Sequence, residues 1–241
     1  MALHSVPKQP EKTMIKFYYS LAPNPMKVAL FLEEAGLPYE SVPVDTRKGE
    51  QFSAEFTALN PNSKVPCIVD GDATVFDSNA ILLYLGEKTG KFMPANTPRL
   101  RGELLSWLMF VASGVGPFSG QAVHFSRFAP EPKEYAVTRY MFEAKRHYGI
   151  VDARLAQHKF MLGDSYTIVD MALWGWARLV PFVLGDDAAL GKLPNLKRLL
   201  DTIDARPAAA RAVALKDRHT FKAEFDDEAK RYMFRHTAQP A

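Results

Sequence analysis

The hydrophobic positions between residues 14 and 93 change their spacing several times. Short runs rich in β-branched and aromatic residues, typical of strands, alternate with runs in which apolar residues recur every three or four positions, as in helices. Strands are predicted at residues 15–19, 39–44, 66–70 and 74–76, and helices at residues 25–35, 51–59 and 78–89. Pro43 cannot donate a ladder hydrogen bond, so the second strand is expected at a sheet edge. The predicted order of elements is βαβαββα.

After residues 94–98 the strand pattern disappears and only helical spacing remains, with a glycine- and proline-rich break at residues 114–117. Helices are predicted at residues 99–112, 132–158, 171–180 and 194–203. Thr167 and Asp170 have the spacing of a capping box before the third of these helices. The charged segment from Lys216 onward still contains apolar residues, which indicates a packed terminal segment. They are Phe221, Phe225, Tyr232 and Met233.

Length and composition narrow the class of protein. The 241 residues are enough for one large or two small domains, and hydrophobic residues make up 47% of them, so a sizeable core is expected. The net charge of +3 is mild and no basic stripe is present, which argues against nucleic-acid binding. No apolar run reaches the roughly 18 residues of a membrane-spanning helix, so no membrane partner is expected.

The cysteine content is equally informative. The one cysteine, Cys67, excludes an internal disulfide, a CxxC redox motif and a thiolate metal cluster, and no metal is expected. Cys67 follows a proline inside an apolar strand, so it is interpreted as an inert core residue rather than a nucleophile. Residues 1–13 are polar, contain two prolines and lack an apolar signal core. They are predicted to be a flexible extension of a cytoplasmic protein.

Two short motifs, Val65-Pro66 and Asp77-Ser78, carry the candidate chemistry. A cis bond is tolerated before proline, and here it would turn the backbone N–H and C=O of Val65 outward. Asp77-Ser78 opens a predicted helix and supplies a hydroxyl and free N–H groups at the positive end of that helix. Together the two motifs predict a small site for a peptide-like anion.

With several further motifs, these residues resemble the glutathione transferase superfamily over about residues 14–215. The further matches are Leu83-Tyr84-Leu85, Leu162-Gly163-Asp164 followed by Thr167 and Asp170, and Arg206-Pro207. The resemblance implies a protein of the α/β plus all-α class that forms a homodimer. Its parts would be a thioredoxin-like N-terminal domain at residues 14–93, a linker at residues 94–100, and an all-helical C-terminal domain with a charged tail at residues 101–241.

Two segments look like the bacterial nu-class proteins of that superfamily. They are residues 22–28, Ala-Pro-Asn-Pro-Met-Lys-Val, and residues 48–52, Lys-Gly-Glu-Gln-Phe. This resemblance implies a disulfide-bond reductase that uses glutathione as co-substrate, with reduction of organic peroxides as a further activity. Classical conjugation of glutathione to an electrophile is one alternative. A non-catalytic glutathione-binding or regulatory protein is another.

The resemblance also implies a partner for each polar group of glutathione. Ser78 suits the γ-glutamyl carboxylate, Asp77 the α-ammonium group, and the Val65 backbone the cysteinyl amide. Gln51 and Lys64 could reach the glycyl carboxylate. The alternatives are structural roles: a helix cap for Ser78, and a solvated surface position for Gln51 and Lys64.

In the helical half, Arg139 matches a family position that helps to hold glutathione carboxylates, although a solvated helix charge is the alternative. His124 and Phe125 follow the glycine-rich break and could line the pocket for a small disulfide, peroxide or electrophile. Four further aromatic residues could do the same, although aromatic residues in a helical domain usually belong to the core. They are Trp107, Phe110, Trp174 and Trp176.

The catalytic question is which residue lowers the pKa of the glutathione thiol, because a free cysteine thiol has a pKa of about 8.5 and reacts as the thiolate. The resemblance points to Asn24, whose amide can donate to sulfur at the start of the first helix. Asn24 could instead be the N-cap of that helix. Nu-class relatives commonly have threonine where this chain has Ala22. Ser20 is a rival thiol partner, as are Tyr18 and Tyr19, of which at least one is expected in the core.

Overall fold

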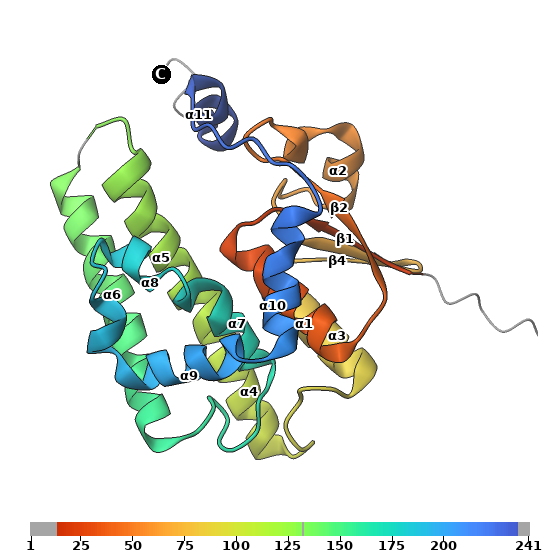
Figure 1. Ribbon diagram of the computed structural model, residues 1–241, viewed down its shortest axis with the longest axis vertical. Coiled ribbons are helices and arrows are strands. Elements are labelled where there is room, and N and C mark those ends of the chain that lie inside the picture. The colour runs from red at the N-terminus through yellow and green to blue at the C-terminus, as the bar shows by residue number, and fades with distance from the viewer. Residues whose placement is uncertain (1–13, 132, 236–241) are drawn as a thin grey trace, which may run out of the picture.

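The computed structural model describes residues 14–131 and 133–235, and the extension predicted at residues 1–13 lies outside the described residues. Figure 1 shows a small sheet with its helices in one half of the molecule and a larger group of helices in the other. The strands are β1 (Ile15–Tyr19), β2 (Tyr39–Pro43), β3 (Cys67–Asp70) and β4 (Ala73–Phe76). The helical elements of this half are α1 (Pro23–Ala35), the 3-10 turn η1 (Glu50–Phe52), α2 (Ala54–Leu59) and α3 (Ser78–Thr89). The predicted order βαβαββα is confirmed.

The sheet has the strand order β2-β1-β3-β4, so β2 lies at an edge, as Pro43 predicts. β1 runs parallel to β2 and antiparallel to β3, and β3 and β4 form an antiparallel hairpin. Tyr18 is opposite Cys67, and Cys67 is in turn opposite Phe76. This register brings the end of β1, the start of β3 and the end of β4 to the same end of the sheet.

Successive residues of β1 face opposite layers of the sheet half, because side chains alternate along a strand. Phe17 and Tyr19 are fully buried in the main core, which also includes residues of α1 and α3. Tyr18 packs on the other face with Phe56 of α2 and with Cys67. The sheet half is therefore a thioredoxin-like layer covered on both faces, as expected.

The second half is helical, as predicted. Its helices are α4 (Pro98–Phe110), α5 (Gly116–Val123), α6 (Glu134–Gln157), α7 (Ile168–Ala177), α8 (Val180–Leu184), α9 (Pro194–Asp204), α10 (Pro207–Val213) and α11 (Asp227–Met233), with the 3-10 turns η4 (Ala189–Lys192) and η5 (Ala214–Asp217). One core joins the two halves, because α1 packs against both α7 and α10. The linker predicted at residues 94–100 overlaps the first turn of α4. In the described ranges, none of the helices is both long and apolar enough to cross a membrane.

The break predicted at residues 114–117 does not end the helix. α4 continues into α5 through a π-helical turn, η2 (Val111–Val115), and α5 continues into a second one, η3 (His124–Phe128). A π-turn accommodates an extra residue without interrupting the helix. Gly116 and Pro117 therefore open α5 instead of forming a loop.

The start of α7 is held by the predicted capping box. The Asp170 carboxylate accepts the Thr167 N–H at 2.8 Å and the Thr167 hydroxyl at 3.0 Å, and it also accepts the Met161 N–H at 2.8 Å. Burial raises the pKa of Asp170 to about 6. A fully buried carboxylate with three donors thus fixes the entry to α7, which begins at Ile168, three residues before the predicted start.

Residues 216–235 form a C-terminal strap that crosses from the helical half to the sheet half. The Lys222 N–H donates to Asp45 Oδ2 at 2.6 Å, which ties the strap to the sheet half. The ring of Phe225 lies 4.8 Å from that of Phe128 in η3, which ties the strap to the helical half. In Figure 1, α11 lies near α2 at the end of the strap. The prediction of a packed terminal segment is confirmed.

Candidate functional site

The peptide bond between Val65 and Pro66 is cis, as predicted. The preceding loop is held by Asn60, whose Nδ2 donates to Lys64 O at 2.6 Å. Among the described residues, none bonds to the backbone N–H or C=O of Val65. This peptide backbone is therefore available to a ligand that carries an amide group.

The Asp77-Ser78 motif lies beside Val65-Pro66 because of the register of the β3–β4 hairpin. Asp77 is the N-cap of α3, and its Oδ1 accepts the N–H groups of Asn79 at 2.9 Å and Ala80 at 3.1 Å. The alternative that Ser78 is the helix cap is therefore wrong. Within the described part of the chain, nothing accepts the backbone N–H of Ser78, so this N–H remains at the positive helix end.

A buried lysine, Lys27 of α1, lies at the same helix end. Its Nζ donates to Ser78 Oγ at 3.2 Å, and its side chain is only 1% exposed. Burial lowers the pKa of Lys27 from 10.5 to about 7, although the Asp77 carboxylate raises it in part. An ammonium group has three N–H donors, and Ser78 Oγ is the one acceptor that the described residues give it. A ligand carboxylate would add a further negative charge to that of Asp77.

Asn24 lies inside the first turn of α1, which begins at Pro23 and not at Pro25 as predicted. Ala22 is the N-cap, so the alternative that Asn24 caps the helix is wrong. Asn24 Oδ1 accepts a hydrogen bond from Trp176 Nε1 at 2.9 Å. Because Pro23 and Pro25 have no N–H, the first three residues of α1 offer a single backbone donor, the N–H of Asn24.

Gln51 and Lys64 lie in different environments. Gln51 is buried, and its Nε2 donates to Thr46 O at 3.2 Å. Its Oε1 is buried without a hydrogen-bond partner, which is unusual for a native side chain. A donor on a ligand would satisfy it. Lys64 is exposed and forms no ion pair with any described residue.

Within one chain, Arg139 lies away from the residues around Val65 and Ser78. Its Nη1 lies 3.2 Å from Glu143 Oε1 on the same helix, α6. In Figure 1, α6 and α3 lie on opposite sides of the molecule. The Arg139 side chain is 52% exposed, so it is accessible from outside the chain.

The side chains of Tyr18, Tyr19 and Cys67 pack in the hydrophobic core. Tyr19 is fully buried, and its hydroxyl donates to Leu215 O at 3.2 Å. Tyr18 packs toward α2. Cys67 is fully buried in the sheet half, as expected of a core residue, and burial raises its pKa to about 11. No group of three or more His, Cys, Asp and Glu side chains among the described residues could hold a metal ion.

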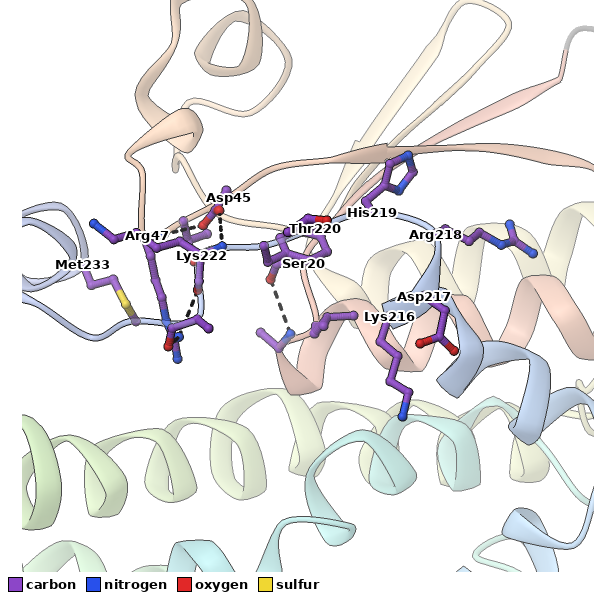
Figure 2. Close-up of a pocket in the computed structure, with 15 residues that line it drawn as sticks. Ser20, Asp45, Arg47, Lys216, Asp217, Arg218, His219, Thr220, Lys222 and Met233 are labelled. Atoms are coloured by element: carbon purple, nitrogen blue, oxygen red, sulfur yellow. Dashed lines mark hydrogen bonds between the residues drawn. The ribbon is translucent and has the colours of Figure 1, made fainter.

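A hollow of about 620 Å³ lies between the end of β1 and the C-terminal strap (Figure 2). It is lined by residues 20–22, 45–47 and 216–223 and by Met233. Ser20 Oγ accepts the Ala22 N–H at 3.4 Å, so this rival thiol partner stabilises the turn that leads to Asn24. Figure 2 shows the Lys216 side chain pointing toward the helical half, and Lys216 has no ion-pair partner among the described residues.

The aromatic residues predicted to line a pocket for the second substrate are not among the described residues that line this hollow. They are His124, Phe125, Trp107, Phe110, Trp174 and Trp176. Trp174 is fully buried and donates from Nε1 to Asp204 Oδ1 at 2.7 Å. His124 packs against Phe125 and against Phe234 of the strap. Trp176 differs from the others because it contacts Asn24.

Two features of the site escaped the sequence analysis: the buried charge of Lys27 and the contact between Trp176 and Asn24. Lys27 lies in a stretch of α1 in which every residue from 25 to 32 is buried. A lysine next to such an apolar run is the signal that could have identified it. Trp176 meets Asn24 across 152 positions of sequence, and no local pattern indicates that contact.

The chain combines a thioredoxin-like sheet that contains a cis-proline loop with a helical domain that follows α3. This combination defines the class of two-domain glutathione-dependent proteins. Comparisons with known proteins narrow this class. The family model described as glutathione S-transferase, N-terminal domain, matches residues 13–87, and the model described as glutathione S-transferase, C-terminal domain, matches residues 110–207. The chain belongs to the glutathione S-transferase family, as its motifs predict.

Individual relatives agree with this assignment. Disulfide-bond oxidoreductase YfcG of Escherichia coli (strain K12) is 39% identical over 222 residues, which cover 89% of this chain and 98% of that protein. Disulfide-bond oxidoreductase YghU of the same organism is 41% identical over 211 residues, covering 80% of this chain and 72% of YghU. A glutathione transferase from Pseudomonas putida, solved with one glutathione disulfide bound per subunit, matches with a TM-score of 0.78 and 31% identity over 87% of this chain and 94% of its own. The resemblance to the nu class is confirmed.

Proposed function

We propose that the chain binds glutathione at the end of the sheet where β1 and β4 end and β3 begins. One observation carries the proposal: the free backbone of Val65 lies beside the hydroxyl and free N–H of Ser78. Val65 would pair with the cysteinyl amide of glutathione, and Ser78 would bind its γ-glutamyl carboxylate. Lys27 lies directly behind the Ser78 hydroxyl and would add a positive charge to that carboxylate subsite.

The remaining groups of glutathione would meet the edges of this site. Asp77 uses Oδ1 to cap α3, so its Oδ2 would accept the α-ammonium group. Lys64, an exposed cation, would pair with the glycyl carboxylate. Gln51 would have to turn outward to reach the same end of the peptide, because its unpartnered Oε1 is buried.

Asn24 would stabilise the glutathione thiolate. Its Oδ1 is occupied by Trp176, so its Nδ2 is the atom that would donate to sulfur. A pKa lowered by about two from the free value of about 8.5 would make the thiolate the main form at neutral pH. Cys67 takes no part, because it is buried and stays protonated.

The reaction would be the reduction of a disulfide. The bound thiolate attacks one substrate sulfur, the substrate S–S bond breaks, and the other sulfur leaves as a thiolate that takes up a proton. A second glutathione thiolate then attacks the glutathione sulfur of the mixed disulfide, whose S–S bond breaks; glutathione disulfide forms and the remaining substrate sulfur leaves as a thiolate that takes up a proton. Two glutathiones are oxidised for each disulfide reduced, so no protein nucleophile is needed. Two relatives named as disulfide-bond oxidoreductases support this assignment over conjugation or simple binding.

The hollow between the end of β1 and the C-terminal strap would receive the second substrate. It is lined by the turn at residues 20–22 that leads into Asn24 and by Lys216, a cation that forms no ion pair with any described residue. A disulfide or peroxide with an anionic group, such as a mixed disulfide of glutathione, would suit that charge. The Pseudomonas putida relative, solved with glutathione disulfide bound, supports this class of substrate.

A homodimer would complete the site. The single chain exposes Phe142 of α6, Met109 of α4 and Phe76 of β4, each more than 40% accessible. Arg139 lies three residues before Phe142 and therefore on the same face of α6. A partner subunit that covers Phe142 would also meet Arg139, which could then hold a glutathione carboxylate of the partner. We further propose a cytoplasmic location, because the reaction needs a pool of reduced glutathione.

The test compares two activities of the same protein sample. Reduction of a small model disulfide is followed by coupling glutathione disulfide formation to glutathione reductase, and conjugation is followed with an aryl halide. Disulfide reduction that clearly exceeds conjugation is expected. Conjugation that exceeds disulfide reduction would instead assign a classical transferase, and silence in both assays from a folded protein would indicate a binding protein.

The variant Asn24→Ala tests the role of the amide. It should lower turnover by about tenfold or more, since one hydrogen bond to a charged sulfur is lost, while the affinity for glutathione changes little. Glutathione affinity is measured by titration calorimetry on the same sample. Unchanged turnover would remove Asn24 from the mechanism.

A further inference from the structure

Trp176 holds the Asn24 amide by its oxygen. The indole Nε1 donates to Asn24 Oδ1 at 2.9 Å across the interface between α7 and the first turn of α1. The same indole nitrogen lies close to Gly116 of α5, where a Cβ would be only 3.2 Å away from it. The helical half therefore fixes the position of the indole, and the indole in turn contacts a side chain of the sheet half.

The approach of α7 to α1 depends on Gly175. A Cβ at this position would lie 2.4 Å from Pro23 O and 2.7 Å from Lys27 Cγ, which is far inside normal contact distance. Glycine is thus the residue that allows α7 to pack directly on the first turn of α1. This close packing brings the next residue, Trp176, within hydrogen-bond distance of Asn24.

The chemistry of an amide gives this contact a consequence. An asparagine carries an acceptor oxygen and a donor nitrogen, and half a turn about its last bond exchanges the two. If Asn24 were free to turn, it could direct either atom at a bound thiolate. Nitrogen would stabilise the negative sulfur, and oxygen would repel it. An indole N–H can only donate, so it selects the orientation in which Nδ2 is the free end.

We propose that Trp176 is a positioning residue that holds the Asn24 amide with its nitrogen directed at the glutathione thiolate. The inference rests on the proposed role of Asn24 in thiolate stabilisation. Trp176 itself touches neither glutathione nor the second substrate in this account. It acts by removing the unfavourable orientation of the amide before glutathione binds.

The test is Trp176→Phe, which keeps an aromatic ring but removes the N–H. Trp174→Phe is the matched control, because Trp174 lies on the same helix and loses an equivalent indole bond, to Asp204. Trp176→Phe should lower kcat for disulfide reduction by about tenfold and leave KM for glutathione nearly unchanged. The pKa of the bound thiol, read from thiolate ultraviolet absorbance against pH, should rise in Trp176→Phe and not in Trp174→Phe.

A double-mutant cycle separates this inference from the proposed function. In an Asn24→Ala background, Trp176→Phe should have no further effect on kcat or thiol pKa, because no amide remains to be oriented. Equal effects of Trp176→Phe in both backgrounds would overturn the inference while leaving the role of Asn24 intact. A lack of effect of Asn24→Ala itself would overturn the proposed thiol chemistry.

A second variant covers the case in which Trp176→Phe does not fold. Gly116→Ala adds a Cβ 3.2 Å from the indole nitrogen, so the indole has to shift by a few tenths of an ångström, which lengthens its bond to Asn24 without removing the donor. A raised thiol pKa in this variant, absent when Asn24 is alanine, supports the inference. A thiol pKa equal to that of the unmodified protein contradicts it.

Discussion

Replacing Lys27 by methionine should change how stability depends on pH. Burial lowers the pKa of Lys27 from 10.5 to about 7, so the folded protein binds this proton less tightly than the unfolded chain does. Each pKa unit corresponds to about 1.4 kcal/mol, and the full difference to about 5 kcal/mol. Below pH 7 this entire cost opposes folding of the unmodified protein.

The sign follows from proton linkage. Between the folded pKa of about 7 and the unfolded value of 10.5, the unfolded chain holds more protons, so stability rises with pH by up to about 1.4 kcal/mol per pH unit. Lys27→Met has similar length and no charge. Below pH 7, the free energy of unfolding of Lys27→Met should therefore increase relative to that of the unmodified protein. This relative gain should shrink steadily as the pH rises toward 10.5.

The assay is urea unfolding of both proteins at a series of pH values, and the quantity of interest is the difference between their free energies of unfolding. Taking the difference cancels the contributions of titrating groups that do not interact with Lys27, such as Tyr39, whose pKa is raised by burial and by its hydrogen bond to Glu33. A difference that stays constant from below pH 7 to above pH 10 would refute the reasoning, because Lys27 would then titrate alike in both states.

The same lysine should link glutathione binding to proton uptake. A γ-glutamyl carboxylate near Ser78 would favour the charged form of Lys27, so binding above pH 7 should take up a proton. Titration calorimetry in buffers of different ionisation enthalpy measures that proton. Lys27→Met should bind glutathione more weakly and lose the uptake; uptake that persists in the variant would assign it to another group.

Two further variants test the carboxylate subsite and the entry to α7. Ser78→Ala should weaken glutathione binding by about tenfold, because a hydrogen bond to a carboxylate is lost; equilibrium titration that gives an unchanged affinity would return Ser78 to a purely structural role. Asp170→Ala should destabilise the protein by about 2–4 kcal/mol, because it leaves the buried N–H groups of Thr167 and Met161 without an acceptor. Thermal unfolding measures this loss, and a melting temperature equal to that of the unmodified protein would contradict it.

The elements that the sequence predicts well depend on local chemistry. Pro43 marks an edge strand because it lacks an N–H, and the pairing of Thr167 with Asp170 marks the start of α7 because the two side chains are three residues apart. The cis bond before Pro66 is likewise permitted by local chemistry, because proline tolerates the cis form. In each case the residue that carries the sequence pattern lies within a few positions of the structural feature that it predicts.

The parts that the sequence does not predict depend on distant contacts. Lys27 is interpretable only once Gly175 brings α7 against α1 and removes the lysine from water. The helix start at Pro23 excludes the capping role that Asn24 alone would suggest. His124 was expected to line a pocket, yet Phe234 of the strap packs against its ring, and the path of the strap is not encoded in the residues around His124.

The π-helical turns η2 and η3 determine the direction in which the side chains of the following helical residues point. An α-helix advances by about 100° per residue, so one additional residue in a turn rotates all later side chains by roughly that angle. Gly116 meets the indole of Trp176 in the phase that η2 establishes. Removing a single residue from 111–115 would restore an ordinary helix and yet turn this face away. The segment should therefore tolerate hardly any change in its length, in addition to the limits that the buried Val111, Gly114 and Val115 place on its side chains.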